Sequence, residues 1–359
     1  PTIDISSLVN QDFNSNKSVK TINKIKKACI NIGFFQVTGH GISKKNIKNI
    51  CNVGNKFFNS SENNKIKLAP KKWNYKNKNI YRGYFPNDVN GKEGLDIGDV
   101  KVTKHGINKK NIKNICNVGN KFFNSSEKNK RKLSPKKWNS KNKNIYRGYF
   151  PNDVNGKEGL DIGDLKVTQN YARRLKNQYI EYINLTKSID NKSIKVLSNY
   201  FDNIFILGEV LFKSIIKLYK KDTNISKKAF SRLKTLSTLR FNYYPNQTKP
   251  VEISKQDGVA LGCETHVDSG IFTILYQDKK GGLQVQNRKT KKWHNVPFNK
   301  NALVVNTGKA LEFLSKGKFK ATNHRVLWNK KKRMSIPFFF EPSYDFKMSS
   351  SFLNASKIN

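Results

Sequence analysis

The chain has 359 residues, and its 69 Lys and Arg against 25 Asp and Glu give a formal net charge of +44 at pH 7. Hydrophobic residues make up 36 % and aromatic residues 11 % of the chain, which supports a packed core and excludes a fully disordered protein. No run of about 18 apolar residues occurs, so we expect no membrane-spanning helix and no membrane partner. The sequence opens without a basic and apolar leader, so we expect no secretory signal.

The positive charge raises the question of a nucleic-acid partner. The lysines are spread along the chain in Lys-Asn-Ile stretches such as residues 44–50. This texture favours a compositional drift of the coding sequence, because charge alone supports only non-specific attraction. We therefore expect no nucleic-acid partner. The four cysteines form no Cys-x-x-Cys pair, which argues against a zinc cluster and indicates a reducing compartment, the cytoplasm.

The first half of the chain contains a tandem duplication. Residues 37–101 and 102–166 are two copies of one 65-residue segment, with 58 positions identical. A solenoid needs about three or more units to bury a continuous face, so two copies do not predict a repeat fold. We interpret the pair as a recent duplication inside a fold that needs one copy, without effect on the chemistry.

The N-terminal half is predicted to mix helices with two short strands. Strands are expected at residues 2–5 and 34–37, and the helical spacing of apolar residues predicts a helix that ends at Gly33. A second helix is expected from about residue 47 to 58, and a loop at 81–101, which is rich in Gly, Pro and Asn. A period of 3.6 residues predicts a long helix at about 193–220.

The C-terminal half is predicted to be rich in strands. Six short apolar runs alternate with turn signals, at residues 239–244, 272–277, 282–286, 302–306, 324–328 and 334–340. Many short strands at this spacing indicate a sandwich or a jelly roll. The chain is therefore expected to be mainly β with flanking helices, with an N-terminal α/β region that contains the duplication.

Two histidines and an aspartate of this half are candidate metal ligands. His266 and Asp268 stand two residues apart, and His324 follows 56 residues later. If His266 and Asp268 share a strand, both side chains point to one face. Two imidazoles and a carboxylate form the facial triad of non-haem Fe(II) oxygenases. The His-x-Asp pair alone is a weak signal, and its context decides its weight.

A candidate carboxylate-binding group lies nearby in the sequence. Arg333 and Ser335 share a face if they lie in a strand, and a guanidinium with a hydroxyl suits a carboxylate. Asn242 and Tyr244 share a face of the strand predicted at 239–244 and supply further hydrogen-bonding groups. A metal triad beside a carboxylate anchor suits a keto acid that chelates the metal at one end.

The motif set resembles the isopenicillin N synthase-like group of Fe(II)/2-oxoglutarate-dependent dioxygenases. The C-terminal motifs that carry the resemblance are LRFNYYPN, ETHVDSGIFTILYQDKKGGLQVQ, WHNVP, LVVNTGKALEFLS, ATNHRV and RMSIPFFFEP. The segments PTIDISSL, ACINIGFFQVTGHGI and FFNSSENNK resemble the N-terminal region of the same group. The resemblance covers nearly the whole chain apart from the extra copy.

The resemblance implies a fold, a reaction and roles for these residues. The fold would be a double-stranded β-helix, or jelly roll, at residues 235–342, preceded by an N-terminal dioxygenase region at 1–234 and followed by a short tail at 343–359. His266, Asp268 and His324 would bind Fe(II), and Arg333 and Ser335 would bind 2-oxoglutarate, with Asn242 and Tyr244 as further contacts. The reaction would use O₂ and 2-oxoglutarate, with ascorbate as a reductant, to oxidise a small molecule.

Some residues depart from the group's pattern or have other expected roles. The group reads Asn-x-Gly-Asp where this chain has Lys309, so we expect a disturbed local hydrogen bond there. His40 and its repeat equivalent His105 precede glycines and are expected in turns; His294 is expected on a surface strand and Cys263 in the core. Two other functions stay open: an oxygenase that acts on nucleic acid or protein, and a catalytically impaired binding protein.

Overall fold

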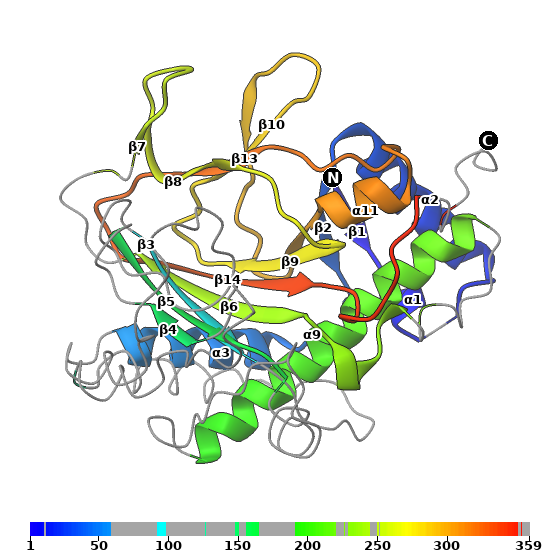
Figure 1. Ribbon diagram of the computed structural model, residues 1–359, viewed down its shortest axis with the longest axis horizontal. Helices are drawn as coiled ribbons and strands as arrows, with labels where there is room; N and C mark the ends of the chain where they lie inside the picture. The colour runs from blue at the N-terminus through cyan, green and yellow to red at the C-terminus, as the bar shows by residue number, and fades with distance from the viewer. Residues whose placement is uncertain are drawn as a thin grey trace.

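The computed structural model describes two β-sheets packed face to face, with helices on the outer side of the larger one (Figure 1). The described residues are 1–10, 12–58, 92–97, 126, 148–150, 156–164, 191–219, 226, 229–244, 250, 252–350 and 353. Within them the chain is mainly β, as predicted. No helix among these residues combines the length and apolarity needed to cross a bilayer.

The larger sheet has nine strands in the order β1-β2-β12-β9-β14-β6-β3-β5-β4, and β5 is also paired directly with β6. Their bounds are Thr2–Asp4 (β1), Phe34–Thr38 (β2), Lys92–Ile97 (β3), Gly148–Phe150 (β4), Gly156–Ile162 (β5), Thr238–Tyr244 (β6), Phe272–Gln277 (β9), Leu303–Thr307 (β12) and Arg333–Phe340 (β14). The smaller sheet has the order β11-β10-β13-β8-β7. Its strands are Glu252–Ile253 (β7), Ala260–His266 (β8), Leu283–Gln286 (β10), Trp293–Asn295 (β11) and His324–Leu327 (β13).

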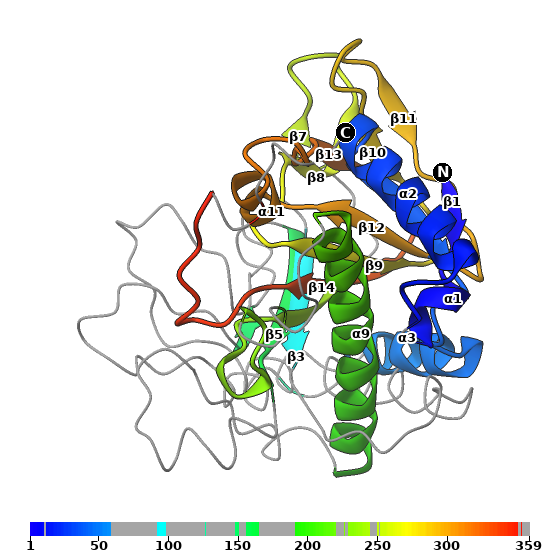
Figure 2. The same cartoon turned by 90° about the vertical axis from the view of Figure 1, so that its right-hand side faces the viewer.

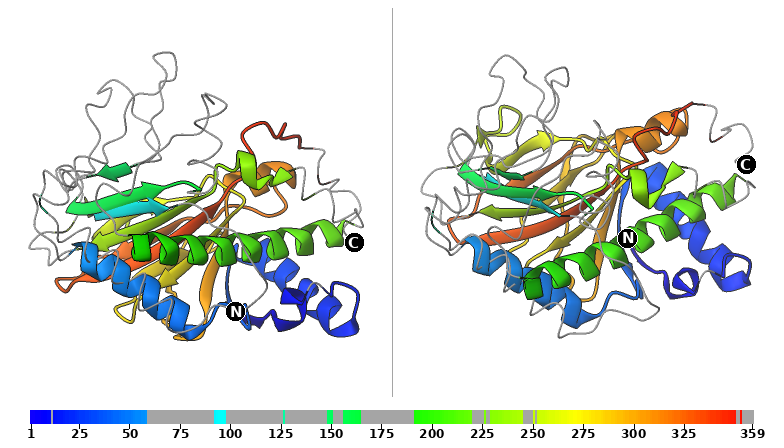
Figure 3. Two further views of the ribbon diagram at one scale, coloured as in Figure 1. Left: turned by 90° about the horizontal axis from the view of Figure 1, so that it is seen from below. Right: turned by 60° about the horizontal axis from the view of Figure 1, so that its bottom comes forward.

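The described helices are α1 (Ser6–Val9), α2 (Asn16–Asn31), α3 (Lys44–Phe58), α9 (Asn191–Leu218) and α11 (Lys309–Leu314), with a 3₁₀ turn at Arg232–Lys234. Helices α3 and α9 cover the outer face of the large sheet, and α2 packs at its β1–β2 edge. Figures 2 and 3 show α9 and α3 lying across the strands of this sheet. The α9 side chain of Phe201 meets Phe338 of β14 edge-on, with ring centroids 5.0 Å apart. The apolar face of α9 thus closes the core on one side and leaves the space between the sheets for a site.

Local sequence signals explain the ends of α2. Ser15 caps its first turn, with its hydroxyl accepting a hydrogen bond from the Ser18 amide. The helix stops before Gly33, whose φ of +77° is a conformation that glycine adopts without strain. A Cβ at Gly33 would lie 2.3 Å from Oγ1 of Thr322, so close packing also requires glycine.

The six strands predicted in the C-terminal half are present, as is the long helix, at α9. The loop predicted at 81–101 is wrong in part, because β3 occupies Lys92–Ile97 and pairs with β6. The segment has charges and a glycine that disfavour a strand locally, and its pairing comes from residues far along the chain. Strand β8 was also missed, since ALGCETH shows no clear alternation. Residues 165–190 and most of 59–147 lie outside the described part of the chain.

Candidate metal centre

Three predicted ligand residues meet between the two sheets. His266 ends β8, His324 begins β13, and the two residues are paired across these antiparallel strands. Nε2 of His266 lies 3.8 Å from Oδ1 of Asp268, and Nε2 of His324 lies 3.7 Å from Oδ2 of the same carboxylate. One donor atom from each residue falls within 4.8 Å of the others, so the three can hold one metal ion.

The position of Asp268 differs from the expectation. We expected His266 and Asp268 to share a strand, but β8 ends at His266, and Asp268 lies in the turn that follows. This turn is fixed by the start of α11, because the amide of Lys309 donates to the carbonyl of Asp268 at 2.8 Å and the amide of Ala310 to that of Ser269 at 2.8 Å. The first amides of a helix have no partner within the helix, and here the ligand-bearing turn supplies one.

Gly308 allows the start of α11 to pack closely against the turn that carries Asp268. A Cβ at Gly308 would lie 2.2 Å from the carbonyl oxygen of Gly270, a distance that backbone atoms do not tolerate. The change to Lys309 was expected to disturb a local hydrogen bond but not a ligand. Its backbone makes the contact with Asp268, and its side chain turns outward to Glu312, 3.0 Å away. The sequence departure at Lys309 therefore leaves the triad intact.

Two further residues that sequence reasoning missed hold the Asp268 carboxylate. Oδ2 accepts hydrogen bonds from Oγ1 of Thr273 at 2.6 Å and from Nδ2 of Asn306 at 2.7 Å. Both side chains are buried, in β9 and β12. Such contacts fix a ligating carboxylate in one orientation. The Asn-x-Gly motif was a signal for Asn306, but nothing local in the sequence singles out Thr273.

Both imidazoles are oriented by backbone carbonyls. Nδ1 of His266 lies 2.8 Å from the carbonyl oxygen of Glu264, and Nδ1 of His324 lies 3.1 Å from that of Thr322. Nδ1 is therefore a protonated nitrogen that donates to the carbonyl, and each Nε2 faces the carboxylate of Asp268. Phe34 packs edge-on against the ring of His324, with centroids 5.2 Å apart.

The electrostatics of the triad favour the ionised carboxylate. Burial raises the pKa of Asp268. The neighbouring imidazoles of His324 and His266, with the hydrogen bonds from Thr273 and Asn306, lower the pKa by more. The pKa of Asp268 therefore lies below its ordinary value. Burial lowers the pKa of His266, and the neighbouring Cys263, Asp268 and Glu264 raise it to about 9. The ionised carboxylate of Asp268 lies between the two imidazoles, which suits a cation site.

The four residues predicted to bind a carboxylate also lie together. On β14 and β6, Arg333 is paired with Tyr244 and Ser335 with Asn242. The Arg333 guanidinium is buried; Nε donates to the carbonyl of Gly281 at 2.7 Å and Nη1 to Oγ of Ser335 at 3.1 Å. Its carbon lies 4.7 Å from the centre of the Tyr244 ring. Oδ1 of Asn242 is buried and accepts no hydrogen bond. These four residues line one cavity together with His266, Asp268 and His324.

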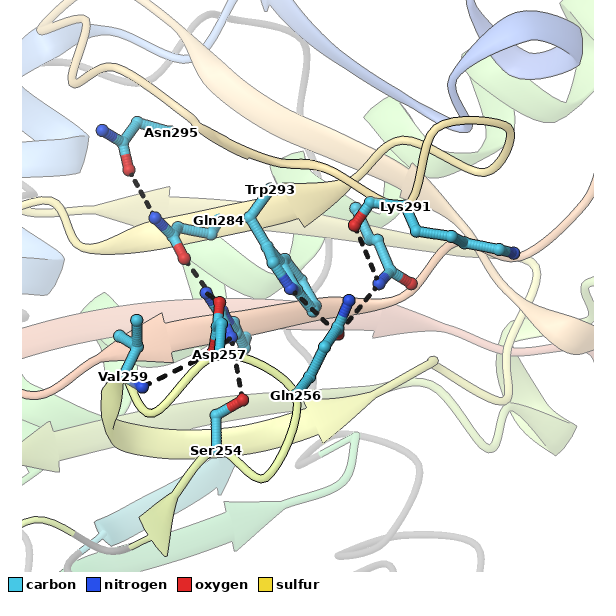
Figure 4. Close-up of polar contacts among 10 residues, drawn as sticks. Ser254, Gln256, Asp257, Val259, Gln284, Lys291, Trp293 and Asn295 are labelled. Carbon is cyan, nitrogen blue, oxygen red and sulfur yellow. Dashed lines mark hydrogen bonds and ion pairs between the residues drawn. The ribbon is translucent and has the colours of Figure 1, made fainter.

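Arg325, next to His324, anchors β13 on its other face. Its guanidinium is buried and donates to both carboxylate oxygens of Asp257, at 3.0 and 2.7 Å, and to Oε1 of Gln284 at 2.8 Å. It also lies 4.0 Å from the centre of the Trp293 ring. Figure 4 shows Ser254 and Asp257, both from the turn between β7 and β8, lying close to Gln284 of β10. This network ties the β7–β8 turn to β10, β11 and β13 and so supports the strand that carries His324.

The other singled-out residues have the roles expected of them where the structure describes them. His40 is buried in a turn, where its Nδ1 accepts from the amide of Ile42 at 3.1 Å. His294 is exposed on β11, and Cys263 is buried in β8. His105 lies outside the described residues.

Two family models match the chain. The model of the 2OG-Fe(II) oxygenase superfamily matches residues 235–342, which contain the whole triad and the Arg333 cluster. Residues 235–342 therefore carry the oxygenase domain of this superfamily. A second model, described as the N-terminal region of a non-haem dioxygenase in morphine synthesis, matches residues 1–101. Members of the superfamily are oxidoreductases that use Fe(II) and 2-oxoglutarate, and so is this protein.

Curated relatives and a solved structure agree with the superfamily. Feruloyl CoA ortho-hydroxylase 2 of Arabidopsis thaliana is 28 % identical over 68 % of this chain, and the match spans 63 % of that enzyme. A probable iron/ascorbate oxidoreductase of Dictyostelium discoideum is 28 % identical over 96 % of this chain and 82 % of its own length. A Neurospora crassa protein, solved at full length with alpha-KG and 5-formyluracil, has the same fold, with a TM-score of 0.63 and 19 % identity over 100 % of this chain and 90 % of that one.

Proposed function

We propose that this oxygenase oxidises a small organic molecule by hydroxylation, desaturation or ring closure, and converts 2-oxoglutarate and O₂ to succinate and CO₂. The observation that carries the proposal is one cavity that contains both the triad and the buried Arg333 guanidinium. In hydroxylation, one oxygen atom of O₂ enters the substrate and the other enters succinate, so the two oxidations balance. The relatives named for small-molecule substrates support this substrate class.

His266, Asp268 and His324 would hold the iron. Two imidazole nitrogens and one carboxylate are a donor set that suits Fe(II) and leaves three positions for other ligands. The donors fit the ion because both Nε2 atoms and the carboxylate face one point, with the carboxylate fixed by Asn306. When bound, the iron supplies the activation of O₂. The protein's own part is to orient the three ligands and to keep water from a buried site.

Arg333, Ser335, Asn242 and Tyr244 would bind 2-oxoglutarate. The buried guanidinium needs an anion in this cavity, and a carboxylate matches its two parallel N–H groups. Ser335 and Tyr244 add hydroxyl groups on the same faces of β14 and β6. The Asn242 amide, whose oxygen accepts no hydrogen bond, also fits a polar ligand. These four residues would place one end of the dicarboxylate away from the metal and leave the keto acid end to reach it.

The test is turnover of 2-oxoglutarate by the purified protein. With Fe(II) and ascorbate, we expect slow formation of succinate without any added substrate, and faster formation when a compound of a small-molecule library is oxidised. His324→Ala serves as the matched control and is expected to lose both rates. A protein that binds iron but forms no succinate with any compound would contradict the proposal.

A cytoplasmic location is also part of the proposal. Cys29, Cys51 and Cys263 are buried free thiols among the described residues, as is usual where disulfides are kept reduced. Burial raises the pKa of Cys29 to about 12, which keeps this thiol protonated and unreactive.

A further inference from the structure

The two copies of the duplicated segment offer strands for the same place in the large sheet. One edge of β6 is paired with β14. The other edge is matched in one register by β3, from the first copy, and by β5, from the second copy. Both pair antiparallel in the same register: Glu93 and Glu158 lie opposite Tyr243, and Ile97 and Ile162 lie opposite Leu239. These two strands are also paired with each other residue for residue, Glu93 with Glu158 and Leu95 with Leu160, so both copies are placed at one position in the sheet. An edge has one row of amide and carbonyl groups, so a single strand satisfies it at a time.

The two strands are equivalent in sequence. Lys92–Ile97 and the corresponding residues 157–162 both read KEGLDI, and none of the seven differences between the copies falls within them. Register is set by which side chains face the core, so strands of identical sequence favour the same register. Neither copy therefore has a sequence advantage at this edge.

Arg240 of β6 connects this position in the sheet to the metal cavity. Arg240 lines the cavity and lies on the same face of β6 as Asn242 and Tyr244. Its guanidinium makes a two-pronged bond to the fully buried Asp161 of β5, from Nε at 2.9 Å and from Nη2 at 2.6 Å. It also lies 5.1 Å from the centre of the Phe339 ring. In the first copy, Asp96 occupies the register position opposite Arg240.

The paired aspartate has a chemical consequence for the cavity. Of the described residues, Arg240 and Arg333 are the two arginines that line it. Arg240 is neutralised by Asp161, whereas Arg333 has a hydroxyl and a carbonyl as hydrogen-bond partners. A dicarboxylate entering the cavity therefore meets one guanidinium whose charge is not balanced by a bonded carboxylate. The aspartate thus selects which arginine receives the acid.

We propose that the two copies supply interchangeable strands beside β6, and that the aspartate each brings, Asp161 or Asp96, is a positioning residue. It holds and neutralises Arg240, so that 2-oxoglutarate binds to Arg333 in the productive orientation. The part concerning 2-oxoglutarate rests on the proposed function, and the strand exchange does not.

Disulfide trapping tests the exchange without any activity measurement. Leu239→Cys is combined with Ile162→Cys in one full-length variant and with Ile97→Cys in another, because facing residues of antiparallel strands lie within disulfide distance. Under mild oxidation, mass spectrometry should find the designed cross-link in both variants, and Leu239→Cys alone should give neither. A cross-link to position 162 only would overturn the exchange.

Kinetics with 2-oxoglutarate test the role of the aspartates. In the full chain, Asp161→Asn and Asp96→Asn should each leave kcat and KM within about 2-fold, because the other copy supplies the carboxylate. The double variant should lower kcat and KM together, by about 5-fold or more, with kcat/KM nearly constant, because 2-oxoglutarate then also binds unproductively to Arg240. Adding Arg240→Gln to the double variant should restore kcat, because a neutral pair of amide side chains then replaces the unpaired charge of Arg240.

The alternative outcomes are distinct. If Asp161→Asn alone behaves like the double variant, the copies are not interchangeable. If the double variant has a lower kcat/KM and a lower melting temperature, and adding Arg240→Gln raises neither, the aspartate has only a structural role. If the wild-type protein forms no succinate while both cross-links appear, the proposed function fails and the strand exchange stands.

Discussion

Asn306 donates a hydrogen bond from Nδ2 to Oδ2 of Asp268 at 2.7 Å, and the same oxygen faces Nε2 of His324 at 3.7 Å. The amide therefore fixes the carboxylate oxygen that lies nearest to His324. Partners of this kind contribute about 10- to 100-fold to metal affinity. We expect Asn306→Ala to weaken Mn(II) binding, used as a redox-stable probe, by that factor. Asn14→Ala, an exposed change in the segment before α2, is the control, and equal affinities for the two variants would contradict the role.

The second prediction concerns the shape of the Arg333 side chain. Arg333→Lys keeps a positive charge but loses the planar fork and its hydrogen bond to the carbonyl of Gly281. A charged hydrogen bond contributes about 1.5–3 kcal/mol, so the KM for 2-oxoglutarate should rise by about 10- to 150-fold. Ser335→Ala, which removes a neutral partner, should have a smaller effect. An unchanged KM in the lysine variant would place the carboxylate elsewhere.

The sequence was sufficient to predict residues that carry both a distinctive side chain and a local pattern. His266, Asp268, His324, Arg333 and Ser335 stand in short motifs, and the cavity contains all five. The six apolar runs of the C-terminal half were predictable because strands alternate within a few residues. These features depend on neighbours in the chain, which a sequence displays directly.

What could not be predicted depends on contacts between distant residues. Thr273 is an ordinary strand residue until β9 places it 2.6 Å from Asp268. The strand β3 has a polar, glycine-containing sequence, and only the pairing with β6 makes it a strand. Asp268 reaches the triad from a turn rather than a strand, because α11 binds that turn from about 40 residues away. Such relationships are set by tertiary packing, which overrides local preference.

The third prediction follows from the packing of α11 on the ligand turn. Gly308→Ala places a methyl group 2.2 Å from the carbonyl oxygen of Gly270, so the turn or the helix must move. We expect a loss of about 1–3 kcal/mol in the free energy of unfolding and weaker metal binding, because the turn carries Asp268. Urea unfolding and Mn(II) titration measure the two effects. Gly317→Ala, where φ is +77° and no atom lies near the Cβ position, is the control for backbone strain away from the ligand turn, and a comparable loss of metal affinity there would remove the explanation.

The fourth prediction concerns pH and the Arg325 network. Hydrogen bonds from Arg325 and Ser254 hold the pKa of Asp257 well below its ordinary value. A carboxyl with a lowered folded-state pKa stabilises the fold above its unfolded pKa, about 3.9, and loses this contribution as the pH falls through the folded pKa. Asp257→Asn should therefore lower the melting temperature by a few degrees at pH 7, and the difference from wild type should narrow below about pH 4. Glu252→Gln, an exposed change on the neighbouring β7, should show no such pH dependence. A difference that stays constant down to about pH 3 would assign the effect to packing.

The fifth prediction concerns the duplication as a whole. Removal of residues 102–166 joins Lys101 to Val167, the same dipeptide that Lys166 and Val167 form in the full chain. Strand β3 then has no competitor for the edge of β6, and Asp96 takes the register position opposite Arg240. We expect this shortened chain to fold and to turn over 2-oxoglutarate within about 2-fold of the full-length rate. In this background Asp96→Asn should lower kcat and KM together, although the same change is silent in the full chain. Because the shortened chain has one copy, an Asp96→Asn variant of it with unchanged kcat and KM would show that Arg240 needs no aspartate. A failure of the shortened chain to fold would show that the second copy has a structural role of its own.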